Sequence, residues 1–415
     1  MSLNTVVIIG GGQAGYQTAA SLRQQGFTGK VTIVNNEPGL PYQRPPLSKG
    51  YLLGTLSAQH LLHRNEKWYA GQDVEVLAGH AVEIDRDGKR VVLEDGSALA
   101  YDHLVLATGA HNRKLPAPGA DLAGVFGMKT QADADAVSER VRAAKNVVVV
   151  GAGFIGLEFA SVAAKLGAKV HVLELADRPM ARALSVPTSQ RFRAAHEGWG
   201  VTFDFGLGLD RIEGEDGEVR RVIASDGRVL EADLVVYGIG VIPNTVLAEE
   251  AGLEISNGIL VDGLLQTSDP DISAVGDAVN FPCVQLDSAP TRLESVQNAA
   301  DQARALAARL MGKPADYIAL PWFWSDQGDL KLQIAGMSNG YDNTVELEVA
   351  DEKQMIVLCF RGDELLAIET VNRPGEHMIA RRILAGEAAL TPEVAGAAGF
   401  NLKEWEQAST AVPVG

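Results

Sequence analysis

Two stretches of the chain share one pattern, in which a short apolar strand runs into a glycine turn and then a helix. The first is Thr5-Val-Val-Ile-Ile-Gly-Gly-Gly-Gln-Ala-Gly, and the second is Asn146-Val-Val-Val-Val-Gly-Ala-Gly-Phe-Ile-Gly. In each case a second apolar strand follows, at 31–34 or at 170–173. This is the pattern of a βαβ unit of about 30 residues. The chain is therefore predicted to be an α/β protein with two Rossmann-type dinucleotide-binding domains.

The two turns carry the spacing GxGxxG. The glycines are Gly10, Gly12 and Gly15 in the first turn and Gly151, Gly153 and Gly156 in the second. In such a turn the first glycine permits the tight bend, the second lets a pyrophosphate approach the backbone, and the third lets the helix pack against the strand. Ile155 lies inside the second turn and is expected to contact the nucleotide there.

An acidic residue follows the second strand of each unit, Glu37 in the first and Glu174 in the second. A carboxylate there can accept hydrogen bonds from the hydroxyls of a ribose. The charge of Glu174 would also repel a 2′-phosphate, so the second site is predicted to prefer NADH to NADPH. The alternative is that both are ordinary solvated acids in loops.

Two such sites imply two dinucleotides, and the natural pair is FAD in the first unit and NADH in the second. Three further strands end in small or acidic residues that suit cofactor contacts. They end at Ala107-Thr108-Gly109, at Gly240 and at Asp277. We expect Asp277 to accept hydrogen bonds from the ribityl chain of FAD.

Composition narrows the function classes. The chain has 415 residues, with 53 acidic and 36 basic side chains and a net charge of −17, which argues against nucleic acids and anionic membranes as partners. The two cysteines, Cys283 and Cys359, form no disulfide scaffold or CxxC motif, and the eight histidines show no metal-binding spacing. No metal site is therefore expected. Since the chain also has no apolar run of about 18 residues and a first strand near Thr5, we expect a cytoplasmic protein.

Four further motifs stand beside the two glycine turns: Leu40-Pro-Tyr-Gln-Arg-Pro-Pro-Leu-Ser-Lys49, Thr267-Ser-Asp-Pro-Asp-Ile-Ser-Ala-Val-Gly-Asp277, Arg292-Leu-Glu-Ser-Val-Gln-Asn298 and Pro321-Trp-Phe-Trp-Ser-Asp-Gln327. Together these motifs resemble a known family, the oxygenase-coupled NADH-dependent ferredoxin reductases of the glutathione-reductase-type flavoproteins. The resemblance covers nearly the whole chain.

The resemblance implies a split FAD domain (1–112 and 245–320), an inserted NADH domain (113–244) and a C-terminal α+β domain (321–415). Proline-containing breaks at 116–119 and 242–244 fit chain crossings between domains. Alternation of apolar and polar residues at 331–335 and 355–360 independently predicts an antiparallel sheet in the last part of the chain.

The resemblance also implies roles for single residues. Lys49 would lie beside the isoalloxazine ring, and Glu158 would be its counter-ion, although a helix N-terminus alone could explain a glutamate there. Arg44 is a candidate for the FAD pyrophosphate, and Trp324, with Trp322, would lie near the flavin unless both indoles are plain core.

Two further sets of contacts are expected. A helix beginning near Leu293 would offer the backbone N–H groups of Val296 and Gln297 to the flavin. Arg182, with Arg178, would hold the phosphates or adenine of NADH.

The reaction is suggested by a missing element, because the segment 45–52 contains no cysteine where disulfide reductases of this superfamily carry a redox thiol. Electrons should therefore leave the flavin singly, toward a [2Fe-2S] ferredoxin that supplies a cytochrome P-450 or a Rieske-type oxygenase. The alternatives are a rubredoxin reductase or another NADH:acceptor flavoprotein, and an interaction flavoprotein like apoptosis-inducing factor. Since ferredoxins of this type are acidic, a basic docking patch is predicted at Arg64, Arg304, Arg309 and Lys313.

Overall fold

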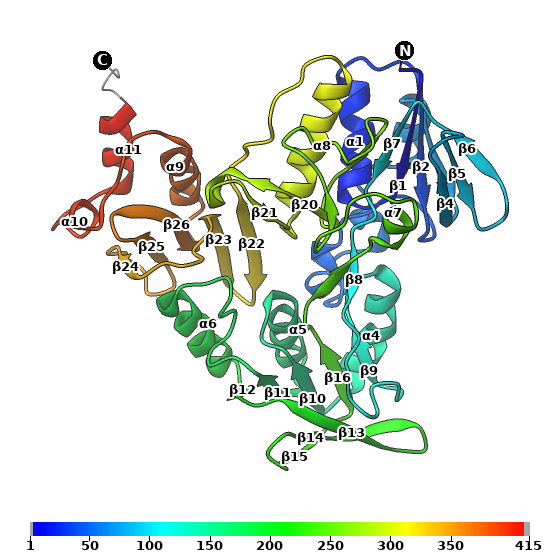
Figure 1. The fold of residues 1–415 in the computed structure, drawn as a ribbon. Coiled ribbons are helices and arrows are strands. Elements are labelled where there is room, and N and C mark those ends of the chain that lie inside the picture. Colours follow the sequence, from blue (N-terminus) through cyan, green and yellow to red (C-terminus); the bar gives the residue numbers. More distant parts are fainter. Residues whose placement is uncertain (1–2, 411–415) are drawn as a thin grey trace. The chain divides into compact units, whose positions relative to one another are not determined.

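The computed structural model describes residues 3–410, whose helices and strands are labelled in Figure 1. These residues fall into two compact units. Unit 1 comprises the residues up to Gln43, Ala58–His111 and Val241–Ala319, and unit 2 comprises Arg44–Ser57, Asn112–Gly240 and the residues from Leu320 onward. The segments predicted as the NADH domain and the C-terminal domain thus fall in one unit. The segment Arg44–Ser57, which the sequence assigned to the FAD domain, belongs to unit 2 as well.

Unit 1 is built on a parallel sheet with the strand order β19-β7-β1-β2-β3. Its strands are β1 (Thr5–Ile9), β2 (Lys30–Asn35), β3 (Val74–Ala78), β7 (His103–Leu106) and β19 (Ile272–Ala274). Helix α1 (Gln13–Gln24) joins β1 to β2 and packs against α8 (Val296–Leu310). The apolar strands therefore form the predicted Rossmann-type βαβ unit, and its GxGxxG turn follows the carboxyl end of β1.

Smaller elements complete unit 1. Two three-stranded sheets have the orders β4-β5-β6 and β18-β20-β21, and β8 pairs with β17. The strands are β4 (Ala81–Asp85), β5 (Arg90–Leu93), β6 (Ala98–Ala100), β8 (Ala110–Asn112), β17 (Val241–Pro243), β18 (Ile259–Leu260), β20 (Val279–Cys283) and β21 (Ala289–Thr291). The helices are α2 (Ala58–Leu61), α3 (Glu66–Gly71), α7 (Val246–Glu250) and the 3-10 turn η2 (Val284–Leu286).

Unit 2 repeats the Rossmann-type pattern in a parallel sheet of order β12-β11-β10-β16-β9. Its strands are β9 (Val125–Gly127), β10 (Asn146–Val150), β11 (Lys169–Glu174), β12 (Val201–Phe205) and β16 (Leu234–Tyr237). The helices are α4 (Gln131–Ala143), α5 (Phe154–Lys165), α6 (Val186–Gly198) and the 3-10 turn η1 (Pro45–Ser48). An antiparallel sheet of β13 (Leu209–Glu215), β14 (Glu218–Ala224) and β15 (Val229–Glu231) lies next to it.

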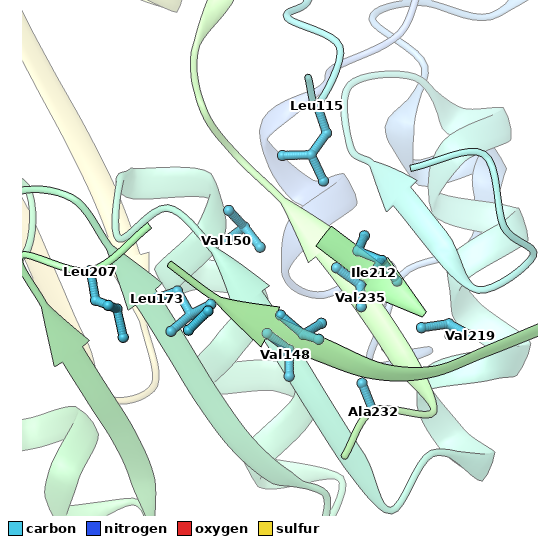
Figure 2. Packing of buried hydrophobic residues seen from close by; sticks show 11 residues of the cluster. Leu115, Val148, Val150, Leu173, Leu207, Ile212, Val219, Ala232 and Val235 are labelled. Carbon is cyan, nitrogen blue, oxygen red and sulfur yellow. The ribbon is translucent and has the colours of Figure 1, made fainter. Parts of the chain in front are cut away.

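The core between these two sheets is aliphatic (Figure 2). Val148, Val150 and Val235 project from the parallel strands, and Ile212 and Val219 project from the antiparallel ones, all at most 7% exposed. Burial of apolar side chains from both sheets fixes the strands that carry the second glycine turn. The edge of the sheet that carries the second glycine turn is thereby held in place by this core.

The last part of unit 2 is a five-stranded antiparallel sheet of order β22-β23-β26-β25-β24. The strands are β22 (Trp322–Gln327), β23 (Leu330–Gly336), β24 (Asn343–Glu346), β25 (Met355–Arg361) and β26 (Glu364–Val371), and the helices are α9 (Pro374–Ala385), α10 (Pro392–Ala395) and α11 (Leu402–Thr410). The antiparallel sheet predicted from the alternation is confirmed, because both predicted strands lie in it. Within residues 3–410, no helix is long and apolar enough to span a membrane.

Candidate functional site

Of the three motif glycines of the first turn, Gly12 alone has open space where a side chain would begin. A Cβ on Gly10 would lie 2.2 Å from the carbonyl oxygen of Ala107, and one on Gly15 would lie 1.9 Å from that of Gly10. Around Gly12, by contrast, no atom lies within 4 Å of such a Cβ. The outer glycines are therefore required by the protein's own packing, whereas Gly12 keeps open space at the N-terminus of α1. This arrangement fits a pyrophosphate.

The second turn repeats this geometry. A Cβ on Gly151 would lie 2.7 Å from the carbonyl oxygen of Gly238, and one on Gly156 would lie 2.2 Å from that of Gly151. At Gly153 the nearest atom would be 3.7 Å away. Ile155, in the first turn of α5, is 39% exposed and remains accessible beside the open position. The residues present therefore fit a dinucleotide at both turns.

The segment that carries Asp277 lies against the first turn of α1. Gly276 has φ +86° and a Cβ there would lie 3.0 Å from Ala14, while its N–H donates to Oε1 of Gln302 on α8 at 2.7 Å. Asp277, the next residue, is partly exposed at this place, so it is brought beside the Gly12 turn within unit 1. No local sequence pattern marks Gln302, because a polar residue within a helix can have many roles.

Helix α8 begins at Val296, three residues later than predicted. The side chain of Ser295 caps the helix by accepting a hydrogen bond from the N–H of Asn298 at 3.0 Å, so the residues before it are not helical. The side chain of Gln297 donates to Asp301 at 2.6 Å. Val296 and Gln297 occupy the first helical turn, where backbone N–H groups lack partners within the helix, and their predicted contacts with FAD stay predictions.

The strand register shows that the two predicted ribose acids occupy different positions. Ile9 pairs with Val34 in unit 1, and Val150 pairs with Leu173 in unit 2. The position equivalent to Glu174 is therefore Asn35, two residues before Glu37. A Cβ at Gly11 would lie 2.4 Å from Oδ1 of Asn35, so this amide lies directly against the first glycine turn.

The two predicted ribose acids thus differ in their surroundings. Glu174 accepts hydrogen bonds from the N–H groups of Ala152 (2.6 Å) and Ala176 (2.8 Å), which fixes its carboxylate beside the second turn. Glu37 lies in the loop after β2 and accepts a hydrogen bond from the hydroxyl of Tyr42 at 2.5 Å. Both remain partly exposed.

The residues at 107–109 and at 240, which follow strands β7 and β16, first of all stabilise the fold itself. Thr108 and Asn244 form a reciprocal pair, with the Thr108 hydroxyl donating to the Asn244 carbonyl at 2.8 Å and the Asn244 amide donating back at 2.7 Å. Gly109 (φ +65°) and Gly240 (φ +96°) have left-handed backbones that favour glycine. Ala107 lies beneath Gly10, as described above.

The structure brings Lys49 and Glu158 together. The ammonium Nζ of Lys49 lies 2.8 Å from Oε1 of Glu158, and the two side chains are 19% and 6% exposed. Glu158 is the fifth residue of α5 and lies two residues after Gly156, the last glycine of the second glycine turn. Lys49 directly follows η1. Removing either partner would leave a largely buried charge unpaired, which is costly.

Two serines that no local sequence pattern marks complete this site. The hydroxyl of Ser48 donates to Oε2 of Glu158 at 2.5 Å, and that of Ser325 donates to Oε1 at 2.6 Å. Both serines are buried. The sequence shows only that Ser325 lies at an inward position of a strand. That position does not distinguish a hydroxyl with a functional role from one that simply has a hydrogen-bond partner in the core.

The arginines predicted to bind phosphates have different settings. Arg44 donates to the carbonyl of Lys129 at 3.0 Å. Arg178 is used within its own loop, where it donates to the carbonyls of Ala181 (3.0 Å) and Leu184 (3.3 Å). Arg182 is exposed, so its guanidinium is more accessible to a bound nucleotide than that of Arg178.

The C-terminal sheet holds the loop that carries Arg178 and Arg182. The buried carboxylate of Glu369 on β26 accepts hydrogen bonds from both the N–H (2.8 Å) and the hydroxyl (2.6 Å) of Ser185, the N-cap of α6. The hydroxyl of Ser338 also donates to the carbonyl of Ala183 at 3.1 Å. Burial raises the pKa of Glu369, while the hydrogen bonds from Ser185 oppose that shift.

The two tryptophans pack on each other and on α9. Their ring centroids are 5.5 Å apart, His377 lies edge-on to Trp322 at 5.5 Å, and the guanidinium of Arg381 lies 4.7 Å from the centre of the Trp322 ring. Both indoles are half-buried. Trp324 is therefore part of a packed aromatic cluster with an accessible side, and its predicted contact with FAD stays a prediction.

The four basic residues predicted as a docking patch separate into two kinds. Arg309 donates to Gln266 (3.1 Å) and Ser273 (2.5 Å), so its guanidinium is engaged with β19 and is not a free surface cation. Its inclusion in the patch is not supported, because α8 turns that position inward. Arg304 (side chain 56% exposed), Arg64 and Lys313 are on the surface.

Both thiols are buried, and neither lies in Arg44–Ser57. Burial raises the pKa of Cys283 and of Cys359, so little thiolate forms at neutral pH. We therefore expect iodoacetamide at pH 7.5 to leave NADH-to-ferricyanide turnover within about 20% of its initial value, since a thiol must ionise to react. The measurement is turnover before and after alkylation, with modification quantified by mass spectrometry. Loss of turnover in step with labelling of either cysteine would contradict this view.

In the described part of the chain, no group of three or more His, Cys, Asp or Glu side chains is arranged to hold a metal ion.

Comparison with known proteins agrees with this geometry. Residues 4–303 match the family described as pyridine nucleotide-disulphide oxidoreductase, and residues 322–405 match the family described as reductase C-terminal. Rhodocoxin reductase of Rhodococcus erythropolis is 48% identical over 400 residues, covering 96% of this chain and 93% of the relative.

Two solved structures are similar along almost their whole length. The ferredoxin reductase for the CYP199A2 system from Rhodopseudomonas palustris has a TM-score of 0.94 and 45% identity, covering 97% of this chain and 100% of that one. The covalent putidaredoxin reductase–putidaredoxin complex has a TM-score of 0.94 and 39% identity, covering 99% of both chains.

Two Rossmann-type units, each with an open glycine turn, define a reductase that uses two dinucleotides. The chain belongs to the pyridine nucleotide-disulphide oxidoreductase family and carries that family's reductase C-terminal domain. It is an oxidoreductase that uses FAD and NAD(H).

Proposed function

We propose that this protein is an NADH-dependent ferredoxin reductase that passes single electrons to a [2Fe-2S] ferredoxin serving a cytochrome P-450 or a Rieske-type oxygenase. The observation that carries the proposal is the segment Pro45–Lys49, which places a lysine in an ion pair with Glu158 and contains no sulfur. Similarity to rhodocoxin reductase and to the two ferredoxin-reductase structures supports the same acceptor class.

The roles of the chain's own residues follow from their settings. The Gly12 turn, with Asp277 beside it, would hold FAD, and the Gly153 turn, with Glu174 and Arg182, would hold NADH. FAD held there would supply hydride acceptance from NADH and release of electrons one at a time. Glu158 keeps the ammonium of Lys49 in one place, and this fixed charge favours electron density arriving nearby.

The test is anaerobic stopped-flow mixing of the NADH-reduced enzyme with purified [2Fe-2S] ferredoxins and, separately, with a rubredoxin. We expect reoxidation of the flavin in step with reduction of at least one ferredoxin. Faster electron transfer to rubredoxin than to every ferredoxin tested would replace the proposed acceptor.

Coenzyme choice is proposed to depend on Glu174. In Glu174→Gln the side chain keeps its size but loses the charge that would repel a 2′-phosphate, so the preference for NADH over NADPH in kcat/KM should narrow by roughly tenfold, the effect of about 1.4 kcal/mol. Steady-state assays with both coenzymes measure it. Glu197→Gln, at an exposed helical pair in the same unit, is the control. A wild-type enzyme that uses both coenzymes equally would contradict the proposed role.

We propose that the ferredoxin docks near Arg304 and Arg64, on unit 1. Arg304 is the ninth residue of α8 and lies about 12 Å along the helix from its first residue, whereas Lys313 lies beyond the C-terminal end of the helix at Leu310. Arg64 lies over the rings of Tyr16 (5.9 Å) and Trp68 (6.0 Å), which holds its charge at the surface. Lys313 is the weaker candidate because of its distance from the helix N-terminus.

Reversing the charge in Arg304→Glu should slow ferredoxin reduction about threefold to tenfold at low salt while NADH-to-ferricyanide turnover stays unchanged, because a charge near a docking surface acts on the association rate. The same reversal at Arg193, an exposed helical arginine of unit 2, is the control and should change neither activity. If the two Arg304→Glu activities fall together, or neither falls, Arg304 is not part of the docking surface.

A further inference from the structure

Strand β22 runs along α5 with its inward side chains matched to that helix. The ring of Phe323 lies 4.5 Å from that of Phe154, and two residues later the Ser325 hydroxyl meets the Glu158 carboxylate. Residues two apart on a strand and four apart on a helix share a face, so both contacts belong to one continuous seam. The C-terminal sheet therefore reaches the ion pair directly.

Ser325 and Lys49 bind the same oxygen. Oε1 of Glu158 lies 2.6 Å from the Ser325 hydroxyl and 2.8 Å from Nζ of Lys49, while Oε2 receives the Ser48 hydroxyl. A carboxylate held at both oxygens cannot rotate freely, so the position of Lys49 depends on these hydroxyls as well as on the charge of Glu158. Ser325 is fully buried, so solvent water cannot replace its hydrogen bond to Glu158.

The direction of the Ser325 hydroxyl is fixed by residues behind it. The Gln327 amide donates to the Ser325 oxygen at 3.1 Å, which leaves the single hydroxyl hydrogen of Ser325 for Glu158. The Oε1 of Gln327 lies 2.9 Å from Nε2 of His196. Burial lowers the pKa of His196 to about 4, so its ring is neutral at pH 7 and has one N–H to donate.

We propose that Ser325, oriented by Gln327 and His196, is a positioning residue for the Lys49–Glu158 pair in hydride transfer. The chain of donors runs from His196 through Gln327 and Ser325 and ends on the carboxylate, with every member in unit 2. The C-terminal domain thereby sets the geometry of a pair whose members both lie outside it. This inference rests on the proposed role of that pair.

The test compares three variants of the FAD-loaded enzyme. Ser325→Ala removes the hydroxyl, and Gln327→Met removes the group that orients it. Ser161→Ala is the matched control, because Ser161 is a buried serine of α5 that donates to the backbone carbonyl of Glu158 at 2.7 Å and does not touch the carboxylate.

Two measurements are made on each variant. The first is the rate of flavin reduction by NADH in anaerobic stopped flow, with its dependence on NADH concentration. The second is the rate of reductive methylation of Lys49, read by mass spectrometry against Lys30, which lies in a more exposed ion pair. Lysine labelling does not depend on hydride transfer, so it reports on the pair alone.

We expect Ser325→Ala to slow saturated flavin reduction roughly tenfold with little change in the NADH concentration at half-saturation, and to label Lys49 several-fold faster. Gln327→Met should show both effects more weakly, and Ser161→Ala should show neither. Unchanged labelling and reduction in Ser325→Ala would overturn the inference and leave the proposed function standing. Faster labelling with unchanged reduction would overturn the link to hydride transfer, and if Glu158→Gln then also reduced at the wild-type rate, the proposed role of the pair would fail with it.

Discussion

The Gly12→Ala variant should fold normally and lose FAD. Gly12 has φ −81°, which any residue adopts, and a Cβ there meets no protein atom within 4 Å. The methyl group would instead occupy the space beside the N-terminus of α1, and a pyrophosphate pushed outward would lose hydrogen bonds from backbone N–H groups. Loss of two such bonds, at about 1.5 kcal/mol each, lowers affinity roughly 100-fold.

The measurements are the flavin content of the purified protein and the midpoint of thermal unfolding of the FAD-free protein. Gly153→Ala provides the matched variant, because Gly153 has φ −78° and comparable room. It should retain FAD but require much more NADH for flavin reduction. If Gly12→Ala kept a full complement of FAD, the first turn would not be the pyrophosphate site.

The Lys49→Gln variant should retain FAD but reduce it with NADH about 100-fold more slowly. The substitution removes the charge that pairs with Glu158 and leaves a polar side chain one bond shorter, and electrostatic stabilisation of this kind commonly contributes two to three orders of magnitude in rate. Stopped-flow flavin reduction at saturating NADH measures the effect.

Lys30→Gln is the control, because Lys30 also forms an ion pair, with Glu75 at 3.1 Å, but has a side chain that is 60% exposed. It should reduce flavin at the wild-type rate. A Lys49→Gln enzyme that kept its flavin and its rate would show that the ion pair is a structural contact only.

Much of the fold was predictable because its signals are local. A run of valines before GxGxxG specifies a buried strand and a tight turn within a dozen residues, and both units form as predicted. The alternation in β23 and β25 likewise specified an antiparallel sheet. The start of α8 was misplaced by three residues because Ser295, rather than an earlier residue, provides the cap.

The site was less predictable where it depends on register and on distant contacts. Glu37 and Glu174 were both predicted as ribose acids, but strand pairing shows that they occupy different positions, because the counterpart of Glu174 is Asn35. Ser325 is 167 positions from Glu158, and no local pattern marks such a contact. An arginine near the end of a helix usually lies at the surface. Arg309 instead points toward Ser273, because α8 packs on the sheet at this position.

The hydrogen bonds between Glu369 and Ser185 limit how far the parts of this family can be exchanged. The N-cap of α6 receives its partner from a strand almost 200 residues later, so a chimaera that joined this NADH-binding segment to a relative's C-terminal domain would need a carboxylate at the matching place on that strand. Without one, the Ser185 donors would be buried without an acceptor. Recombination within the family is therefore expected to succeed when these two segments are inherited together and to give poorly folded proteins when they are separated.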